Sequence, residues 1–385
     1  MNTAHGQSQT KNPIGETSKS VLSVRVAGHL KDLAPYQAGK PISELAREIG
    51  IDEVEIVKLA SNENPLGMSP KARKAADSAL SEAWRYPDAD GYELKQAIGQ
   101  FTGVPSGRIV LGNGSNDLLE LVARAVLGPG SSAVYDEHSF IIYRQVTALV
   151  GANGIAVASR NFSHDLDRMA ESVNHSTQIV FVANPNNPTG TFHPEAALRA
   201  FLDKIPCHVL VVLDEAYTDY LPLEDQVNSI ALTQSYSNLL VLRTFSKAYG
   251  LAGLRIGYGI GHPDLIGLFD HVRQPFAVNA VAQAGAIAAL SDTEFLARTR
   301  EMNHAGRQQL ADGMRKLGVV SLPSSGNFIA AHIPNALAIY EKLLKKGVIV
   351  RPLAAYGMKE WLRVSVGLPR ENERFLLALS QVLAE

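Results

Sequence analysis

Residues 238–258 read NLLVLRTFSKAYGLAGLRIGY and combine a buried-strand pattern with reactive side chains. The apolar run suits a strand of a parallel sheet, and Ser246, Lys247 and Arg255 follow it. A lysine amine buried at a strand end loses basicity and can attack a carbonyl carbon. A hydroxyl and a guanidinium beside it are what a phosphate monoester requires. The stretch suggests covalently attached pyridoxal phosphate, but alone it also allows a surface lysine and a surface ion pair.

A second candidate phosphate site is the loop Gly112 to Asn116, which includes Gly114 and Ser115. It follows the apolar run 109–111 and precedes a helical pattern. Backbone N–H groups and the positive end of a helix dipole meet at such a point. An ordinary glycine turn between a strand and a helix is the alternative.

Two more strand ends carry polar groups. The segment NPNNPTG at 184–190 has two prolines and a glycine that restrict its backbone, so Asn187 can be held as a fixed amide donor. Asp214 directly follows the apolar run 209–213, where its carboxylate can keep a ring nitrogen protonated, and Tyr217 can donate to a phenolate oxygen. A helix-capping role for Asp214 remains open.

Two arginines near the C-terminus complete the candidate groups. Arg363 interrupts the strand-like run 361–366, and Arg351 follows the apolar run 348–350. An interior arginine needs an anion, so the pair suits a phosphate or a carboxylate, unless both form surface ion pairs. The eleven histidines show no metal-binding spacing, and we assign no metal.

Composition narrows the class of protein. The 385 residues are 46% hydrophobic and carry a formal net charge of -2, which gives no broad field for nucleic acid or an anionic membrane. No secretory signal is visible, and the apolar stretch 277–290 is too short to span a bilayer, so we expect a cytoplasmic protein. The single cysteine, Cys207, is expected to be a packed thiol.

The order of patterns predicts two domains. From Arg108 strands alternate with helices, which predicts an α/β fold with a mostly parallel central sheet flanked by helices. After Leu290 the pattern changes to that of a smaller α+β unit. We predict an N-terminal arm at 1–30, a small domain from 31–65 and 291–385, and a large cofactor-binding domain at 66–290.

Taken together, the motifs resemble those of fold type I pyridoxal-phosphate-dependent aminotransferases, over nearly all the chain after the arm. Residues 33–42 (LAPYQAGKPI) and 59–67 (LASNENPLG) are most similar to the histidinol-phosphate aminotransferases. NPNNPTG, LDEAY and TFSKAYGLAGLRIGY are shared more widely among related aminotransferases.

The resemblance implies a role for each candidate residue. Lys247 is the expected Schiff-base and proton-transfer lysine, Asp214 pairs with the pyridine nitrogen, and Phe140 stacks on the ring. The implied contacts to the ring oxygen and the cofactor phosphate are Asn187, Tyr217, Gly114, Ser115, Asn116, Ser246 and Arg255. Tyr86 is expected to reach the phosphate across a homodimer interface. The implied substrate contacts are Tyr36, Asn64, Arg351 and Arg363.

The activity that the resemblance implies is a ping-pong transamination in L-histidine biosynthesis. A phosphorylated amino alcohol, L-histidinol phosphate, and a 2-oxo acid, 2-oxoglutarate, are interconverted with 3-(imidazol-4-yl)-2-oxopropyl phosphate and L-glutamate. Two alternatives keep the cofactor: transamination of aromatic amino acids, and decarboxylation of a phosphorylated amino acid. A cofactor-binding regulator of transcription would need an attached DNA-binding module, for which residues 1–30 are too short.

Overall fold

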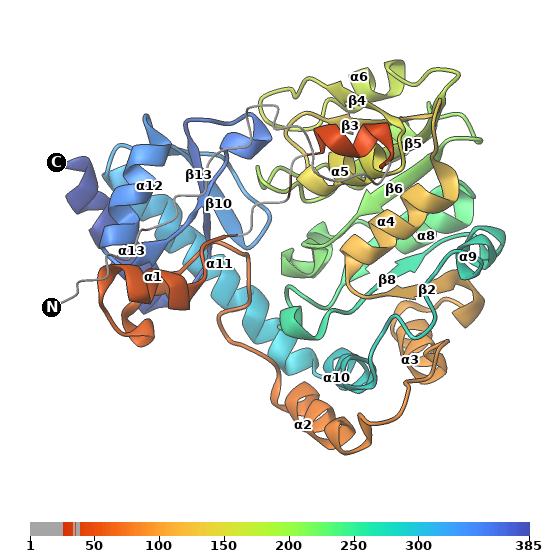
Figure 1. The fold of residues 1–385 in the computed structure, drawn as a ribbon, viewed down its shortest axis with the longest axis horizontal. Coiled ribbons are helices and arrows are strands. Elements are labelled where there is room, and N and C mark those ends of the chain that lie inside the picture. Colours follow the sequence, from red (N-terminus) through yellow and green to blue (C-terminus); the bar gives the residue numbers. More distant parts are fainter. Residues whose placement is uncertain (1–25, 34, 36–38) are drawn as a thin grey trace, which may run out of the picture.

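The computed structural model describes residues 26–33, 35 and 39–385. A twisted seven-stranded sheet forms its centre, in the order β2-β8-β7-β6-β5-β3-β4 within this part of the chain (Figure 1). All neighbouring strands run parallel except β8, which is antiparallel to both β2 and β7. The strands are β2 (Ile109–Gly112), β3 (Ser132–Asp136), β4 (Asn153–Val157), β5 (Thr177–Ala183), β6 (Leu210–Asp214), β7 (Leu239–Thr244) and β8 (Gly257–Ile260).

Alternation along these strands divides their side chains between two apolar layers. In β5, Ile179 and Phe181 pack with α4 (Ser115–Val126), α5 (Ile141–Leu149) and α9 (Pro263–Asp270). Val180 and Val182 pack on the opposite face with α6 (Leu166–Glu171), α7 (Glu195–Leu202) and α8 (Ser229–Ser235). Because both faces are covered, the central strands read as continuous apolar runs rather than as an alternating pattern.

A third apolar cluster lies beside β2 and β8, where α2 (Pro70–Ala79), α3 (Tyr92–Thr102) and α10 (Ala280–Leu290) pack. The side chain of Asn279 caps α10 by accepting from the backbone N–H of Ala282 at 2.8 Å. This helix is the apolar stretch noted in the sequence, and its small residues allow close packing on α2. No helix among the described residues is both long enough and apolar enough to cross a bilayer.

The remaining elements form a smaller α+β unit, at the left of Figure 1. Its sheet has the order β12-β13-β10-β9 within the described residues, and a short parallel pair joins β1 to β11. Leu59, Ile329, Val364 and Phe375 belong to its core. The strands are β1 (Val57–Lys58), β9 (Val320–Ser321), β10 (Phe328–His332), β11 (Val348–Ile349), β12 (Arg351–Pro352) and β13 (Trp361–Ser365), and the helices are α1 (Ile42–Ile49), α11 (Thr293–Lys316), α12 (Ala336–Lys345) and α13 (Pro369–Leu383).

The predicted fold class is confirmed: a mostly parallel sheet flanked by helices is accompanied by a smaller α+β unit. The prediction for Cys207 was wrong, because this thiol is exposed in the connection between α7 and β6. The apolar residues that follow it enter the core, whereas Cys207 precedes the strand. Residues 1–25 of the predicted arm lie outside the described residues, and the domain boundaries remain a prediction.

Candidate active site

One cavity collects most of the predicted site residues. It opens where β5, β6 and β7 end, beside the start of α4, and the arginines of β12 and β13 also line it. Carboxyl ends of parallel strands are where ligands bind in open α/β sheets. The predicted residues that line it are Ser115, Asn116, Phe140, Asn187, Asp214, Tyr217, Ser246, Lys247, Arg255, Arg351 and Arg363.

Lys247 follows β7 and reaches into the cavity from its loop. Its Nζ donates to the backbone oxygen of Ser61 at 3.1 Å and lies 5.8 Å from the ring centroid of Tyr217. Burial lowers the pKa of Lys247 to about 8, and the positive charge of Arg363 acts in the same direction. A neutral amine, the form that attacks carbonyl carbon, is therefore accessible near neutral pH.

Asp214 is the last residue of β6, and its carboxylate is buried in the cavity wall. The hydroxyl of Tyr143 donates to Oδ2 at 2.9 Å, and the backbone N–H of Ala216 donates to Oδ1 at 3.2 Å. Burial raises the pKa of Asp214 to about 6 despite these donors. A carboxylate in this condition is stabilised by a cationic group beside it, such as a protonated ring nitrogen.

The start of α4 forms a cradle for an anion. Gly114 precedes the helix at φ 86°, and no side chain caps the helix's first N–H groups. A Cβ on Gly114 would lie 2.4 Å from Nη2 of Arg255, so only glycine lets this guanidinium approach. Arg255 also donates to Oγ of Ser246 at 3.3 Å. Uncapped helix N–H groups, a hydroxyl and a guanidinium are together suited to a phosphate dianion.

A hydrogen-bonded set orients the polar groups on the other side of the cavity. Arg363 donates through Nη1 to Oδ1 of Asn187 and through Nη2 to the backbone oxygen of Ala60. Because Oδ1 of Asn187 accepts that bond, its Nδ2 is the atom that can donate to a ligand. Asn62 donates to the hydroxyl of Tyr217 at 3.0 Å, and burial raises the pKa of Tyr217 to about 12. Tyr217 therefore stays protonated and can donate to an oxyanion.

Arg351 and Arg363 are direct partners across the antiparallel pair β12–β13, so their side chains lie on the same face of the sheet. Both are buried, and both line the cavity. Two like charges placed opposite one another cost stability unless an anion shares them. The register of this small sheet thus places two guanidinium groups together as a second candidate anion site, apart from the one at α4.

Comparison with known proteins places this geometry in a family. The family model for class I and II aminotransferases matches residues 54–379. Histidinol-phosphate aminotransferase 1 of Thiobacillus denitrificans is 55% identical over 365 residues, which are 95% of each chain. Histidinol-phosphate aminotransferase 2 of Nitrosospira multiformis is 54% identical over 92% of this chain and 91% of its own. The chain belongs to the histidinol-phosphate aminotransferases, within the class I and II aminotransferases.

Solved structures agree with this assignment. Histidinol-phosphate aminotransferase from Sinorhizobium meliloti, in complex with pyridoxal-5'-phosphate, superposes with a TM-score of 0.87 at 30% identity and covers 95% of this chain and 99% of its own. Aspartate aminotransferase from Thermus thermophilus has a TM-score of 0.82 at 22% identity over 93% of this chain, which is a likeness of fold alone. The family and the fold type predicted from the motifs are therefore confirmed.

Three described residues that we predicted for this histidinol-phosphate aminotransferase site do not line the cavity. Gly114 lies behind Arg255 and serves by its missing side chain. The amide of Asn64 is used inside the protein, where it donates to the backbone oxygen of Ala248 at 2.9 Å, and the expected substrate contact stays a prediction. Tyr86 is 82% exposed and stacks on Phe276, with ring centroids 4.7 Å apart. Tyr36 lies outside the described residues.

Among the cavity residues that sequence reasoning missed, two hold predicted side chains in place. Tyr143, on α5, is fully buried, and its hydroxyl donates to Asp214. In the sequence it is one of several residues on the apolar face of an amphipathic helix, so nothing distinguishes it from a core residue. Asn62 holds Tyr217, and its φ of 56° marks an unusual backbone that favours asparagine. The motif SNENP contains both Asn62 and Asn64, so the sequence indicated this loop. It did not indicate which of the two asparagines faces the cavity.

No set of three or more His, Cys, Asp or Glu side chains in the described ranges is arranged to hold a metal ion.

Proposed function

We propose that this chain transfers the amino group of L-histidinol phosphate to 2-oxoglutarate. The products are 3-(imidazol-4-yl)-2-oxopropyl phosphate and L-glutamate, a step of L-histidine biosynthesis. The observation that carries the proposal is one cavity lined by a lysine amine of lowered pKa and by two separate groups of residues suited to bind anions, one at the start of α4 and one at β12–β13. The family assignment supports the same reaction.

The residues present fit pyridoxal 5'-phosphate. Ser246, Arg255 and the first N–H groups of α4 would hold its phosphate, in the cradle that a Cβ on Gly114 would fill. Asp214 would face its ring nitrogen, and Phe140 would pack on the ring. When bound, the cofactor supplies an aldehyde for a covalent link to an amine and a ring that accepts electrons from the substrate's α-carbon.

Lys247 performs the protein's part of the covalent and proton-transfer chemistry. Its amine attacks in the neutral form, which burial and Arg363 make accessible. Once the substrate amine has displaced Lys247, its Nζ would accept the proton from the substrate α-carbon. The same Nζ would then deliver a proton to C4′ of the cofactor. Its bond to the Ser61 oxygen keeps Nζ at the cavity rather than in solvent.

Three other side chains stabilise charge as it develops. Asp214 remains ionised beside a protonated ring nitrogen, and Tyr143 holds its carboxylate in place. Tyr217 and Asn187 donate to the ring oxygen. Because these donors are already oriented by Asn62 and Arg363, little reorganisation is needed during the reaction.

The second anion site would select the substrate. We assign the substrate phosphate, and in the second half-reaction the carboxylate of the 2-oxo acid, to Arg351 and Arg363. A paired guanidinium site recognises either anion through charge-assisted hydrogen bonds. A pair of guanidinium groups at this position disfavours an amine that carries neither a phosphate nor a carboxylate.

Assembly and cellular location belong to the proposal as well. The exposed ring pair of Tyr86 and Phe276 is suited to an interface, and we propose a homodimer in which Tyr86 reaches the partner's cofactor phosphate. We also propose the division into an arm at 1–30, a small domain from 31–65 and 291–385, and a large domain at 66–290. The cytoplasm is the compartment that fits a biosynthetic enzyme of this kind.

A half-reaction titration tests the proposed substrate. Enzyme saturated with pyridoxal phosphate is mixed, without a 2-oxo acid, with histidinol phosphate, phenylalanine or tyrosine. The conversion of the aldehyde spectrum to the amine spectrum is then followed. We expect conversion at the lowest concentration with histidinol phosphate. Conversion that is more efficient with phenylalanine or tyrosine would refute this substrate and favour an aromatic aminotransferase.

A further inference from the structure

Strands β3 and β5 separate just before the active site. Their ladder pairs Val134 with Val180 as its last partners, although the strands continue to Asp136 and Ala183. The loops that follow these two strand ends carry Phe140 and Asn187, which both line the cavity. The relative position of the two loops is therefore not set by sheet hydrogen bonds at this point.

The imidazole of His164 fills the place of the missing ladder bond. The backbone N–H of Ala183 donates to Nε2 of His164 at 3.2 Å. A backbone N–H can only donate, so Nε2 must carry a lone pair and the proton of the neutral ring sits on Nδ1. Nδ1 lies 3.6 Å from Oδ2 of Asp136, and both side chains are fully buried. Neither atom has a hydrogen-bond partner among the described residues, so the two face each other in a buried polar contact that is longer than a hydrogen bond.

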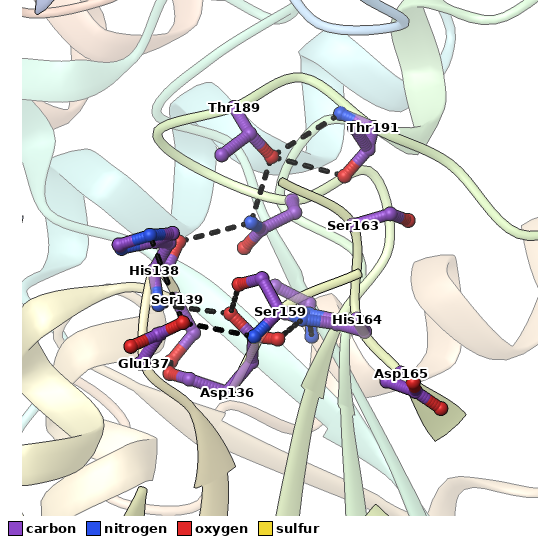
Figure 2. Close-up of polar contacts among 12 residues, drawn as sticks. Asp136, Glu137, His138, Ser139, Ser159, Ser163, His164, Asp165, Thr189 and Thr191 are labelled. Atoms are coloured by element: carbon purple, nitrogen blue, oxygen red, sulfur yellow. Dashed lines mark hydrogen bonds and ion pairs between the residues drawn. The ribbon is translucent and has the colours of Figure 1, made fainter. Parts of the chain in front are cut away.

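Asp136 also accepts hydrogen bonds from its own loop and from the segment that follows β4 (Figure 2). Its Oδ1 accepts from Oγ of Ser159 at 2.6 Å and from the backbone N–H of His138 at 2.8 Å. Burial by itself would raise the pKa of Asp136, but its hydrogen-bond donors, with His164 foremost, hold the pKa below its ordinary value. The carboxylate is thus charged, and its Oδ2 is left for the Nδ1–H of His164.

A second contact joins the loop after β3 directly to the loop after β5. Nδ2 of Asn186 donates to the backbone oxygen of His138 at 3.1 Å and to Oγ1 of Thr189 at 2.9 Å. Asn186 immediately precedes Asn187, and His138 lies two residues before Phe140. The loops that carry Phe140 and Asn187 are therefore joined directly by this bond.

We propose that Asp136 and His164 are a positioning pair for catalysis. They lock together the ends of β3 and β5, so that the stacking ring of Phe140 and the amide of Asn187 meet the cofactor ring from fixed positions. The inference rests on the proposed function, because it assigns the two positioned residues to the cofactor. Neither member of the pair lines the cavity, so neither is a catalytic residue.

Three substitutions of His164 separate the hydrogen bond from Ala183 from the contact with Asp136. His164→Gln places an amide oxygen at the reach of Nε2 and keeps an acceptor for Ala183. His164→Asn places an amide N–H at the reach of Nδ1 and keeps a donor for Asp136. His164→Leu keeps neither. His175→Leu, at an exposed histidine before β5, is the matched control.

Each variant is saturated with pyridoxal phosphate and compared by visible circular dichroism of the bound cofactor, by kcat and KM, and by Tm. We expect His164→Leu to change the circular dichroism per bound cofactor and to lower kcat by about 10- to 100-fold, as a small misplacement of reacting groups does. The Gln and Asn variants should each recover part of the circular dichroism and part of kcat. The control, His175→Leu, should match the wild type in both. KM for the 2-oxo acid should change much less than kcat.

Several results would overturn the inference. An unchanged dichroism and kcat in His164→Leu would do so, and so would activity losses that only parallel losses of Tm and bound cofactor. If the leucine variant does not fold, equal dichroism and kcat in the Gln variant, the Asn variant and the wild type would also overturn it. A wild type without a cofactor band in the visible range would instead refute the proposed function, and this inference with it.

Discussion

The substitution Tyr143→Phe isolates one hydrogen bond in the cavity wall. It removes the hydroxyl that donates to Oδ2 of Asp214 at 2.9 Å. The ring itself stays packed, because Tyr143 stacks on Phe181 with centroids 4.8 Å apart and planes 2° from parallel. The expected effect is therefore electrostatic: the ionised form of Asp214 loses a donor, while the shape of the core is preserved.

The size of the effect follows from the burial of Asp214. Its pKa is raised to about 6 by burial, with Tyr143 acting to lower it. A hydrogen bond to a charged group contributes about 1.5–3 kcal/mol, and one pKa unit corresponds to about 1.4 kcal/mol. Loss of the hydroxyl should therefore raise the pKa of Asp214 by about 1–2 units, to about 7–8.

The sign of the pH dependence is fixed by the form that binds. A protonated ring nitrogen needs the carboxylate, so cofactor binding must ionise Asp214 wherever the pH lies below its pKa in the cofactor-free protein. Near pH 5 the variant should bind pyridoxal phosphate about 10- to 100-fold more weakly than the wild type. Near pH 9, where Asp214 is ionised in both proteins, the two dissociation constants should agree within about twofold.

The assay is an equilibrium titration of cofactor-free enzyme with pyridoxal phosphate at several pH values. At each pH the dissociation constant of the variant is divided by that of the wild type. This ratio cancels the contribution of groups that titrate equally in both proteins, including those of the cofactor. In an Asp214→Asn background the effect of Tyr143→Phe should lose its pH dependence. Tyr236→Phe, whose hydroxyl donates to Asp203 in an exposed pair, is the surface control. A ratio that does not change between pH 5 and pH 9 would refute the reasoning.

Four further outcomes are expected. Lys247→Ala should abolish turnover and the visible band of the lysine-bound cofactor; a variant that keeps both would contradict the assignment. The pKa of Lys247 is lowered to about 8, so stopped-flow capture of the cofactor aldehyde should speed up as pH rises to about 8 and then level off, rather than rise on to the ordinary lysine pKa. Arg363→Ala should weaken binding of histidinol phosphate by about 10- to 100-fold, with cofactor content near wild type; equal losses of both would indicate a structural arginine. Gly114→Ala should lower cofactor affinity by about tenfold or more, because its Cβ would meet Arg255, while Gly253→Ala, which has open space, should not; dialysis against cofactor-free buffer measures both.

The sequence was sufficient to predict which strand-end residues share one cavity. Strands buried on both faces appear as unbroken apolar runs, so the end of each run shows where the chain enters the ligand-binding edge. Asp214, Asn187 and Lys247 each follow such a run, and the structure brings all three to one cavity. Their roles could be proposed because each depends mainly on the residue's own strand and the loop after it.

The tertiary structure decided the contacts between elements that are distant in the sequence. Periodicity shows that a side chain is buried but not what lies opposite, so the sequence does not reveal that the hydroxyl of Tyr143 donates to Asp214. The same limit explains why Asn64 was chosen although Asn62 lines the cavity. Two residues apart in an irregular loop, the asparagines have no periodic pattern that assigns a direction.

What the sequence by itself determined is the set of strands, the reactive residues at their ends and the family. What only the folded chain decided is how strands from different parts of the sequence are registered. The register of β12 against β13 places Arg351 opposite Arg363, and the early end of the β3–β5 ladder leaves the Ala183 N–H to His164. The physical reason is that hydrogen-bond register depends on both strands and on the loops that join them, so neither strand's sequence contains it.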